Sequence, residues 1–168
     1  PALYSVATGC AMPGDRFITS DEACTDPALN GYPHFRTGAV PIIVLFSDAL
    51  FHNGAGGSNA YSSSTLGFDA PTYDQAVTAL GDIRARVIGV SSSSYGRGDL
   101  EQLVRDTGTV DATGNPFIYD QTGDFGNLVV NAVLSVSNGV PLDIAARGID
   151  DPSDSVDAMV FIDQIVPA

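Results

Sequence analysis

The chain has 168 residues, of which 44% are hydrophobic, and this is enough for one domain with a buried core. Its formal net charge is -13, all 7 basic residues are arginine, and nearly all of the 20 acidic residues are aspartate. Such a surface repels phosphate backbones and anionic lipid, so we expect no nucleic-acid partner. The chain has no apolar run near the roughly 20 residues of a membrane span, and no leader-like beginning, so we expect no membrane insertion.

The many aspartates have two interpretations. Short, rigid carboxylates are good ligands of hard divalent cations, which favours a setting rich in salt or divalent ions. A solvated acidic coat that keeps the protein soluble accounts for most of them without any ligand.

The first part of the chain predicts a short helical end followed by an irregular segment. Leu3, Tyr4 and Ala7 share one helical face, Gly9 is a stop signal, and residues 10–38 are rich in Pro, Gly, Asp and Thr. Cys10 and Cys24 lie in this segment and match no zinc-binding spacing. We expect a disulfide between them, which implies an oxidising, extracellular setting; the alternative is two unpaired thiols.

Strands and helices then alternate. Residues 40–47 form an unbroken apolar run, which predicts a strand buried on both faces, and residues 85–90 predict a second strand. Between them, after a polar loop, a helix begins at Thr72 or Asp74 and ends at Gly81. Asp99 is the predicted N-cap of the next helix, which Gly108 ends. The apolar helical positions are Tyr73, Ala76, Val77 and Leu80, then Leu100, Leu103 and Val104.

The last predicted elements complete this alternation. Residues 116–119 form a minimal strand, and Asp124 caps a helix that Gly139 and Pro141 terminate. Strands alternating with helices predict an α/β fold with a doubly wound, mostly parallel sheet over residues 1–140. The sequence pattern changes at residues 141–168, which predict two strands around an acidic turn. We expect this short β segment to begin a β-sandwich. The apolar positions of the last helix are Phe125, Leu128, Val129, Ala132, Val133 and Val136.

Ligands of open α/β sheets bind beyond the carboxyl ends of the strands. Asp48 follows the first strand there, and Ser91 to Ser94 follow the second. Asp48 has three interpretations: a cap on the backbone N–H groups of its own loop, a ligand of a divalent cation, or a catalytic carboxylate.

The residues favour no catalytic site. The chain has no glycine-rich nucleotide loop and no GxSxG elbow. Ser47, His52 and Asp48 do not predict a triad, because adjacent strand residues point to opposite faces. We expect His52 to form a hydrogen bond within its loop, and we predict that the protein is not an enzyme.

One stretch resembles a known family. IIVLFSDALFHNG is similar to the fourth-strand segment of von Willebrand factor type A domains, especially the integrin β-subunit variety. ARVIGVSSSS resembles the next strand, DLEQLVRDTG the helix after it, and GDFGNLVVNAVLSVSNGVPLDIAARG the last helix with its exit into a β-sandwich. The similarity covers roughly residues 36–147, in order, and FSDALFH is its most specific part.

The resemblance implies an adhesion module. In this family a Mg²⁺ or Ca²⁺ ion at a metal-ion-dependent adhesion site takes a carboxylate from a protein or matrix ligand, and Asp48 matches one of the metal ligands. The family's Asp-x-Ser-x-Ser motif does not precede Asp48 in this chain. Asp151, Ser153 and Ser155 match its spacing, but Pro152 and Asp154 indicate a turn there, so a separate Ca²⁺ loop and a plain acidic turn are the alternatives.

From these observations we expect the C-terminal half of such a domain. The chain would be ordered together with the missing half of the domain or with neighbouring subunits. The leading hypothesis is an extracellular or cell-surface module that binds a protein or matrix ligand through a divalent cation. The alternative is a structural subunit of a surface filament or matrix that binds no metal.

Overall fold

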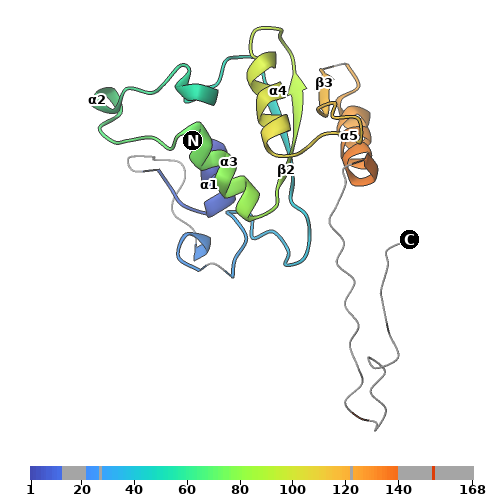
Figure 1. The fold of residues 1–168 in the computed structure, drawn as a ribbon, viewed down its shortest axis with the longest axis horizontal. Coiled ribbons are helices and arrows are strands. Elements are labelled where there is room, and N and C mark those ends of the chain that lie inside the picture. The colour runs from blue at the N-terminus through green and yellow to red at the C-terminus, as the bar shows by residue number, and fades with distance from the viewer. Residues whose placement is uncertain (13–21, 27, 122, 140–152, 154–168) are drawn as a thin grey trace.

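The computed structural model describes residues 1–12, 22–26, 28–121, 123–139 and 153, and the structural statements below concern these residues (Figure 1). Two 3-10 turns, Glu22–Cys24 and Ala55–Gly57, lie in the longer connections. No helix in the described part is long and apolar enough to cross a membrane. The remaining elements, in chain order, are α1 (Ala2–Thr8), β1 (Ile42–Ser47), α2 (Ser63–Leu66), α3 (Tyr73–Asp82), β2 (Arg86–Ser91), α4 (Arg97–Asp106), β3 (Ile118–Asp120) and α5 (Phe125–Gly139).

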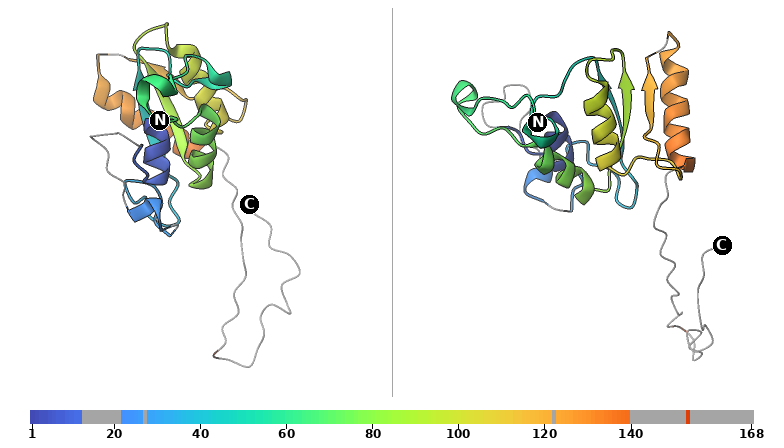
Figure 2. Two further views of the ribbon diagram at one scale, coloured as in Figure 1. Left: turned by 90° about the vertical axis from the view of Figure 1, so that its left-hand side faces the viewer. Right: turned by 45° about the horizontal axis from the view of Figure 1, so that its top comes forward.

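The three strands form a parallel sheet in the order β1-β2-β3. On one face Val87 packs with residues of α1, α3 and α4, and on the other Ile88 packs with Ala132 and Val136 of α5. Figure 2 shows α4 and α5 on opposite sides of the strands. The predicted α/β class is therefore confirmed: the sheet is small, parallel and covered by helices on both faces.

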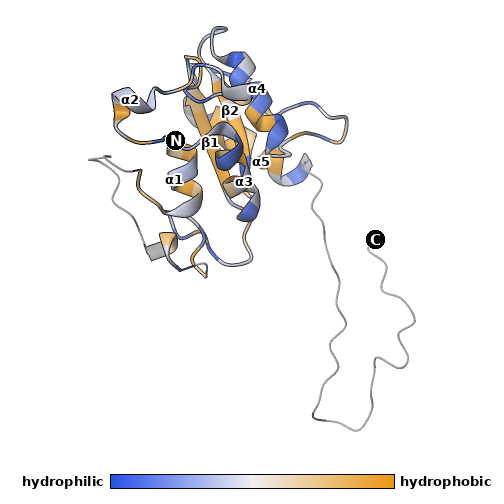
Figure 3. Ribbon diagram, turned by 60° about the vertical axis from the view of Figure 1, so that its left-hand side comes forward, coloured by the Kyte–Doolittle hydropathy of each residue, from blue (hydrophilic) through white to orange (hydrophobic). Residues whose placement is uncertain are grey.

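The predicted helices form where their apolar residues recur. Thr72 and Gln75 make a reciprocal capping box at the start of α3, and Ala76, Ala79 and Leu80 are its buried residues. Leu100, Leu103 and Val104 make the buried stripe of α4, while its outer face is hydrophilic (Figure 3). Asp124 accepts a hydrogen bond from the Asn127 backbone N–H at 3.3 Å, which confirms it as the cap of α5.

The sequence prediction for β1 is wrong about its burial. Its residues are half-buried, and Phe46 is 40% exposed, although the whole strand is apolar up to Ser47. The reason is its place: among the described residues β1 pairs only with β2 and forms an edge of the sheet. The apolar run is typical of a strand in a parallel sheet that is covered on both faces.

Three further predictions change in detail. Helix α4 begins at Arg97, with Gly96 as its N-cap, so Asp99 is not the cap. Helix α3 continues past Gly81 to Asp82, and the polar loop before it contains the short helix α2. The predicted β segment at 141–168, with Asp151 and Ser155, lies outside the described residues; only Ser153 of it is described.

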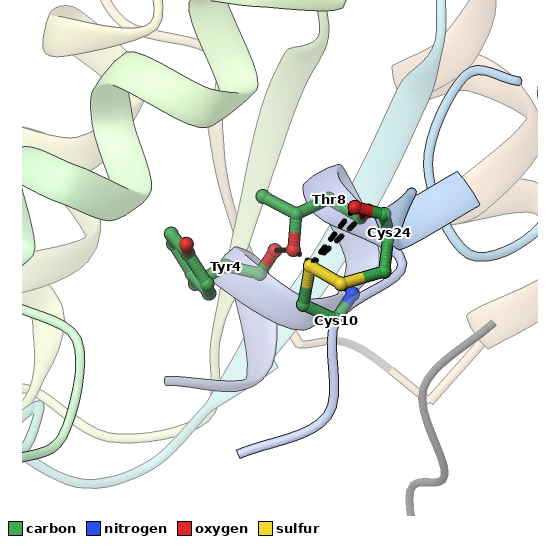
Figure 4. The surroundings of a disulfide bond; sticks show 4 residues. All are labelled: Tyr4, Thr8, Cys10 and Cys24. Carbon is green, nitrogen blue, oxygen red and sulfur yellow. Dashed lines mark hydrogen bonds between the residues drawn. A yellow bond between two sulfur atoms is a disulfide. The ribbon is translucent and has the colours of Figure 1, made fainter. Parts of the chain in front are cut away.

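The predicted disulfide is present (Figure 4). The sulfur atoms of Cys10 and Cys24 are 2.07 Å apart and connect the end of α1 to the 3-10 turn Glu22–Cys24. Thr8 stabilises the backbone before the disulfide: its hydroxyl donates to the Tyr4 carbonyl at 2.9 Å and accepts from the Cys10 N–H at 3.1 Å. Because α1 packs against α3, the disulfide fastens the irregular segment to the helical layer.

Removing this disulfide should lower stability. Its cysteines are 14 residues apart, and closing a loop of about 15 residues is worth about 3 kcal/mol through the lost freedom of the unfolded chain. We expect the Cys10→Ser, Cys24→Ser double variant to lose about this much free energy of unfolding in urea titrations. The reduced natural chain is the matched control, and equal stability of the oxidised and reduced natural chain would contradict the expectation.

A buried threonine holds the start of β2. Thr109, which is fully buried, accepts a hydrogen bond from the Val87 backbone N–H at 2.9 Å, and its hydroxyl lies 3.2 Å from that of Thr107. The Thr109→Val variant keeps the volume but leaves a buried N–H unpaired, so we expect a loss of about 1–3 kcal/mol in the free energy of unfolding. Thr109→Ser keeps the hydroxyl and should lose less. The expectation fails if Ser is the more damaging substitution in chemical denaturation.

Candidate functional site

The carboxyl edge of the sheet ends in a row of polar residues. The strand register aligns Ser47 of β1 with Ser91 of β2, and Ser91 with Asp120 of β3. Aligned residues of parallel strands lie on the same face of the sheet, which here is the face that α4 covers. The chain therefore changes from apolar to polar at the same level in all three strands.

Asp48 stands directly beyond this row and is exposed. Among the described residues, none forms a hydrogen bond or an ion pair with its carboxylate. Of the interpretations of Asp48, the cap on its own loop backbone is thus not supported by the described residues, and other groups hold this segment. The Ser47 hydroxyl donates to the Ala49 carbonyl at 3.0 Å, and Asp99 of α4 accepts from the Phe51 N–H at 2.7 Å.

Residues 48–51, which we call the β1 turn, also touch the beginning of α4. A Cβ atom on Gly96 would lie 2.1 Å from the Ala49 carbonyl oxygen, so only glycine allows this approach. Gly89 of β2 has a similar role beneath the helix, because a Cβ there would lie 3.3 Å from Val104 and 2.3 Å from Ile118. These two glycines let α4 lie close to both the sheet and the β1 turn.

Asp120, which lies at the same edge, is not predicted as a site residue from the sequence. Arg97, the first residue of α4, forms ion pairs with Asp120 and, at 2.9 Å, with Glu101. The hydrogen bond to Glu101 makes the largest contribution to raising the pKa of the Arg97 guanidinium, and the contacts with Asp120 raise it further. The available signal was an aspartate directly after a predicted strand, which is also the position of Asp48.

The serines at positions 91–94, which follow β2, do not form a reactive site with His52 and Asp48. Ser91 is buried and its hydroxyl donates to the Ser93 carbonyl at 2.6 Å. His52 Nδ1 lies 3.1 Å from the Asn59 carbonyl oxygen, and its ring stacks on Tyr61 with centroids 4.3 Å apart. The predicted hydrogen bond of His52 within its loop is therefore confirmed.

Asp111, between α4 and β3, is a useful contrast to Asp48. One carboxylate oxygen of Asp111 accepts from the Thr113 N–H at 2.8 Å, the Thr113 hydroxyl at 2.7 Å and the Asn115 N–H at 2.9 Å. These hydrogen bonds lower the pKa of Asp111 to about 2, and that of the Thr113 hydroxyl has the largest effect. The Asp111 carboxylate is thus occupied by its own loop, whereas no described residue forms a hydrogen bond with the Asp48 carboxylate.

Asp48 fits the role of a single cation ligand, because it is an exposed oxygen donor with no competing hydrogen bond among the described residues. Those residues bring no group of three or more His, Cys, Asp or Glu side chains together in a way that suits a metal ion. Any further oxygen ligands would come from serine hydroxyls, backbone carbonyls, water, a bound partner or residues outside the described part.

Comparison with known proteins adds no assignment: no protein-family model, no curated protein and no solved structure matches the chain significantly.

Two neighbouring glycines test the contact between α4 and the β1 turn. Gly96→Ala places a methyl group against the Ala49 carbonyl and should cost about 1–3 kcal/mol of unfolding free energy. Gly98→Ala is the matched control: nothing lies within 4 Å of its Cβ position, and alanine in a helix should stabilise by about 0.5–1 kcal/mol. Urea titrations should therefore show shifts of opposite sign. Equal shifts would show that the close approach at Gly96 does not matter.

Proposed function

We propose that this chain is an extracellular or cell-surface binding module of the von Willebrand factor A type, in which Asp48 helps a Mg²⁺ or Ca²⁺ ion hold a protein or matrix ligand. One observation carries the proposal: an exposed carboxylate without a partner among the described residues lies at the carboxyl end of a parallel strand. This is where ligands of open α/β sheets bind.

The chemistry of the site suits a hard cation better than a catalytic step. Mg²⁺ and Ca²⁺ prefer carboxylate, carbonyl and water oxygens, and a cation held through one carboxylate keeps positions open for an oxygen ligand from a partner. At this edge the structure gives Asp48 no histidine partner, since the His52 ring is engaged with Asn59 and Tyr61. The proposed role of Asp48 is thus to bind and orient an ion.

The apolar composition of β1 supports the proposed need for a completing partner. β1 has apolar residues on both faces, yet in the described part it is an edge strand without the charges or prolines that usually protect one. We propose that the missing half of the domain, or a neighbouring subunit, lies against this edge. That partner would also bring the remaining oxygen ligands.

A structural subunit is the second candidate, and α5 favours it. The helix contains no charged residue, and its Val130 and Leu134 are 56% and 53% exposed. Large apolar side chains that are exposed on a protein surface commonly mark a place where another protein packs. In this alternative α5 and the β1 edge pack against other subunits of a surface filament or matrix, and no cation binds.

Cation titration separates the two candidates. In the natural protein that contains this chain, calorimetry with Mg²⁺ and Ca²⁺ should give a dissociation constant of about 10⁻⁴ to 10⁻³ M, as in other extracellular modules. Asp48→Asn should abolish this binding, because it removes the charged ligand. At ten times the dissociation constant, the ion should add about 1.4 kcal/mol to the unfolding free energy of the natural protein only.

The control is Asp82→Asn, which removes the same charge from an exposed position at the end of α3 and should leave binding intact. No cation binding by the natural protein would overturn the adhesion proposal and favour the structural subunit. A chemical activity that survives chelation but is lost in Asp48→Asn would instead indicate an enzyme.

A further inference from the structure

The Asp48 carboxylate has no anchor of its own among the described residues, yet the turn that carries it is fixed at both ends. On one side Ser47 belongs to the sheet, where its carbonyl accepts from the Ser92 N–H at 3.4 Å. On the other side the Phe51 N–H donates to Asp99 at 2.7 Å. Only three residues separate Ser47 from Phe51, so these two contacts restrict where Asp48 can lie.

Asp99 belongs to a helix that is well packed against the sheet. It is in the first turn of α4, whose Leu100, Leu103 and Val104 are almost completely buried against the sheet. A hydrogen bond from a backbone N–H to a charged carboxylate is roughly twice as strong as one between neutral groups. The bond to Phe51 spans 48 positions of the chain and is partly buried. It therefore ties the β1 turn to the helical layer.

Gly96 supplies a second contact at the same place. Its bare Cα lets the backbone of α4 rest against the Ala49 carbonyl, as the 2.1 Å approach of an added Cβ shows. Asp99, in the first turn of α4, and its N-cap Gly96 thus both contact the residues directly after Asp48. Neither contact uses the Asp48 carboxylate.

We propose that the first turn of α4 is a latch that positions Asp48, with Asp99 and Gly96 as its positioning residues. The inference rests on the proposed cation site and deepens it: Asp99 acts through the Phe51 N–H and does not touch the ion. Groups that orient a metal ligand commonly change metal affinity about 10–100-fold when they are replaced. The latch also makes the affinity at Asp48 depend on the position of α4.

The test compares Asp99→Ala with Asp99→Asn in the natural protein that contains this chain. The Asn side chain keeps an oxygen that accepts from Phe51, whereas Ala removes it, and both remove the charge. We expect Asp99→Ala to weaken Mg²⁺ binding at least about tenfold in calorimetry. Asp99→Asn should stay within about threefold of the natural protein, because a neutral acceptor still orients the turn. Asp74→Ala, in the first turn of α3, is the matched control and should leave Mg²⁺ affinity unchanged.

A measurement without metal keeps the latch separate from the cation site. In the ion-free protein, NMR should show faster amide hydrogen exchange at Phe51 and shifted resonances at Asp48 and Ala49 in Asp99→Ala, and much smaller changes in Asp99→Asn. If these changes occur but the natural protein binds no cation, the proposed function fails while the latch stands. Unchanged Phe51 exchange in Asp99→Ala overturns the latch, and so does an equal loss of Mg²⁺ affinity in the Ala and Asn variants.

Discussion

The close contact between α4 and the end of β1 is the constraint on which the carboxyl edge of this sheet depends. Gly96 brings the helix backbone against the Ala49 carbonyl, and Gly89 leaves room beneath the helix on β2. Once α4 is held there, its first turn reaches two strand ends: Asp99 accepts from the Phe51 N–H, and Arg97 pairs with Asp120. Two glycines and two charged side chains at the start of α4 therefore help to fix the strand ends at this edge.

Periodic apolar residues made most of the elements predictable from sequence. Leu100, Leu103 and Val104 identify α4, and the run before Asp48 identifies β1. The start of α4 was mispredicted because Asp99 looks like a local N-cap, whereas its carboxylate accepts a bond from a residue 48 positions away. Propensity describes neighbours in the chain and cannot report such a contact. The burial of β1 was mispredicted for the same reason, since it depends on which strands stand beside it.

In the candidate site, too, local sequence predicts some features, whereas others depend on contacts between residues far apart in the chain. The position of Asp48 at a strand end followed from the apolar run before it. The absence of a partner for its carboxylate among the described residues did not follow, because local rules favour an aspartate in a turn that caps nearby N–H groups, as Asp111 does with Thr113 and Asn115. In the β1 turn Asp99 of α4 accepts the hydrogen bond from the Phe51 N–H instead, and no described residue occupies the Asp48 carboxylate. The difference between the two aspartates lies in tertiary contacts that no local pattern contains.

The negative charge of the chain explains why a cation would help an acidic ligand to bind at Asp48. A chain with a formal net charge of -13 repels a partner that offers a carboxylate, and salt screens this repulsion only beyond roughly 8–10 Å. Under the proposed function, an ion of charge +2 at Asp48 would reverse the sign of the charge at that point and would offer the partner's carboxylate a coordination position. The helix α5 and the strand β1 carry no charged residue, so another subunit would meet less local repulsion there than elsewhere on the acidic surface. The proposed cation-dependent binding and the proposed packing of a neighbouring subunit would therefore use different parts of the same acidic surface.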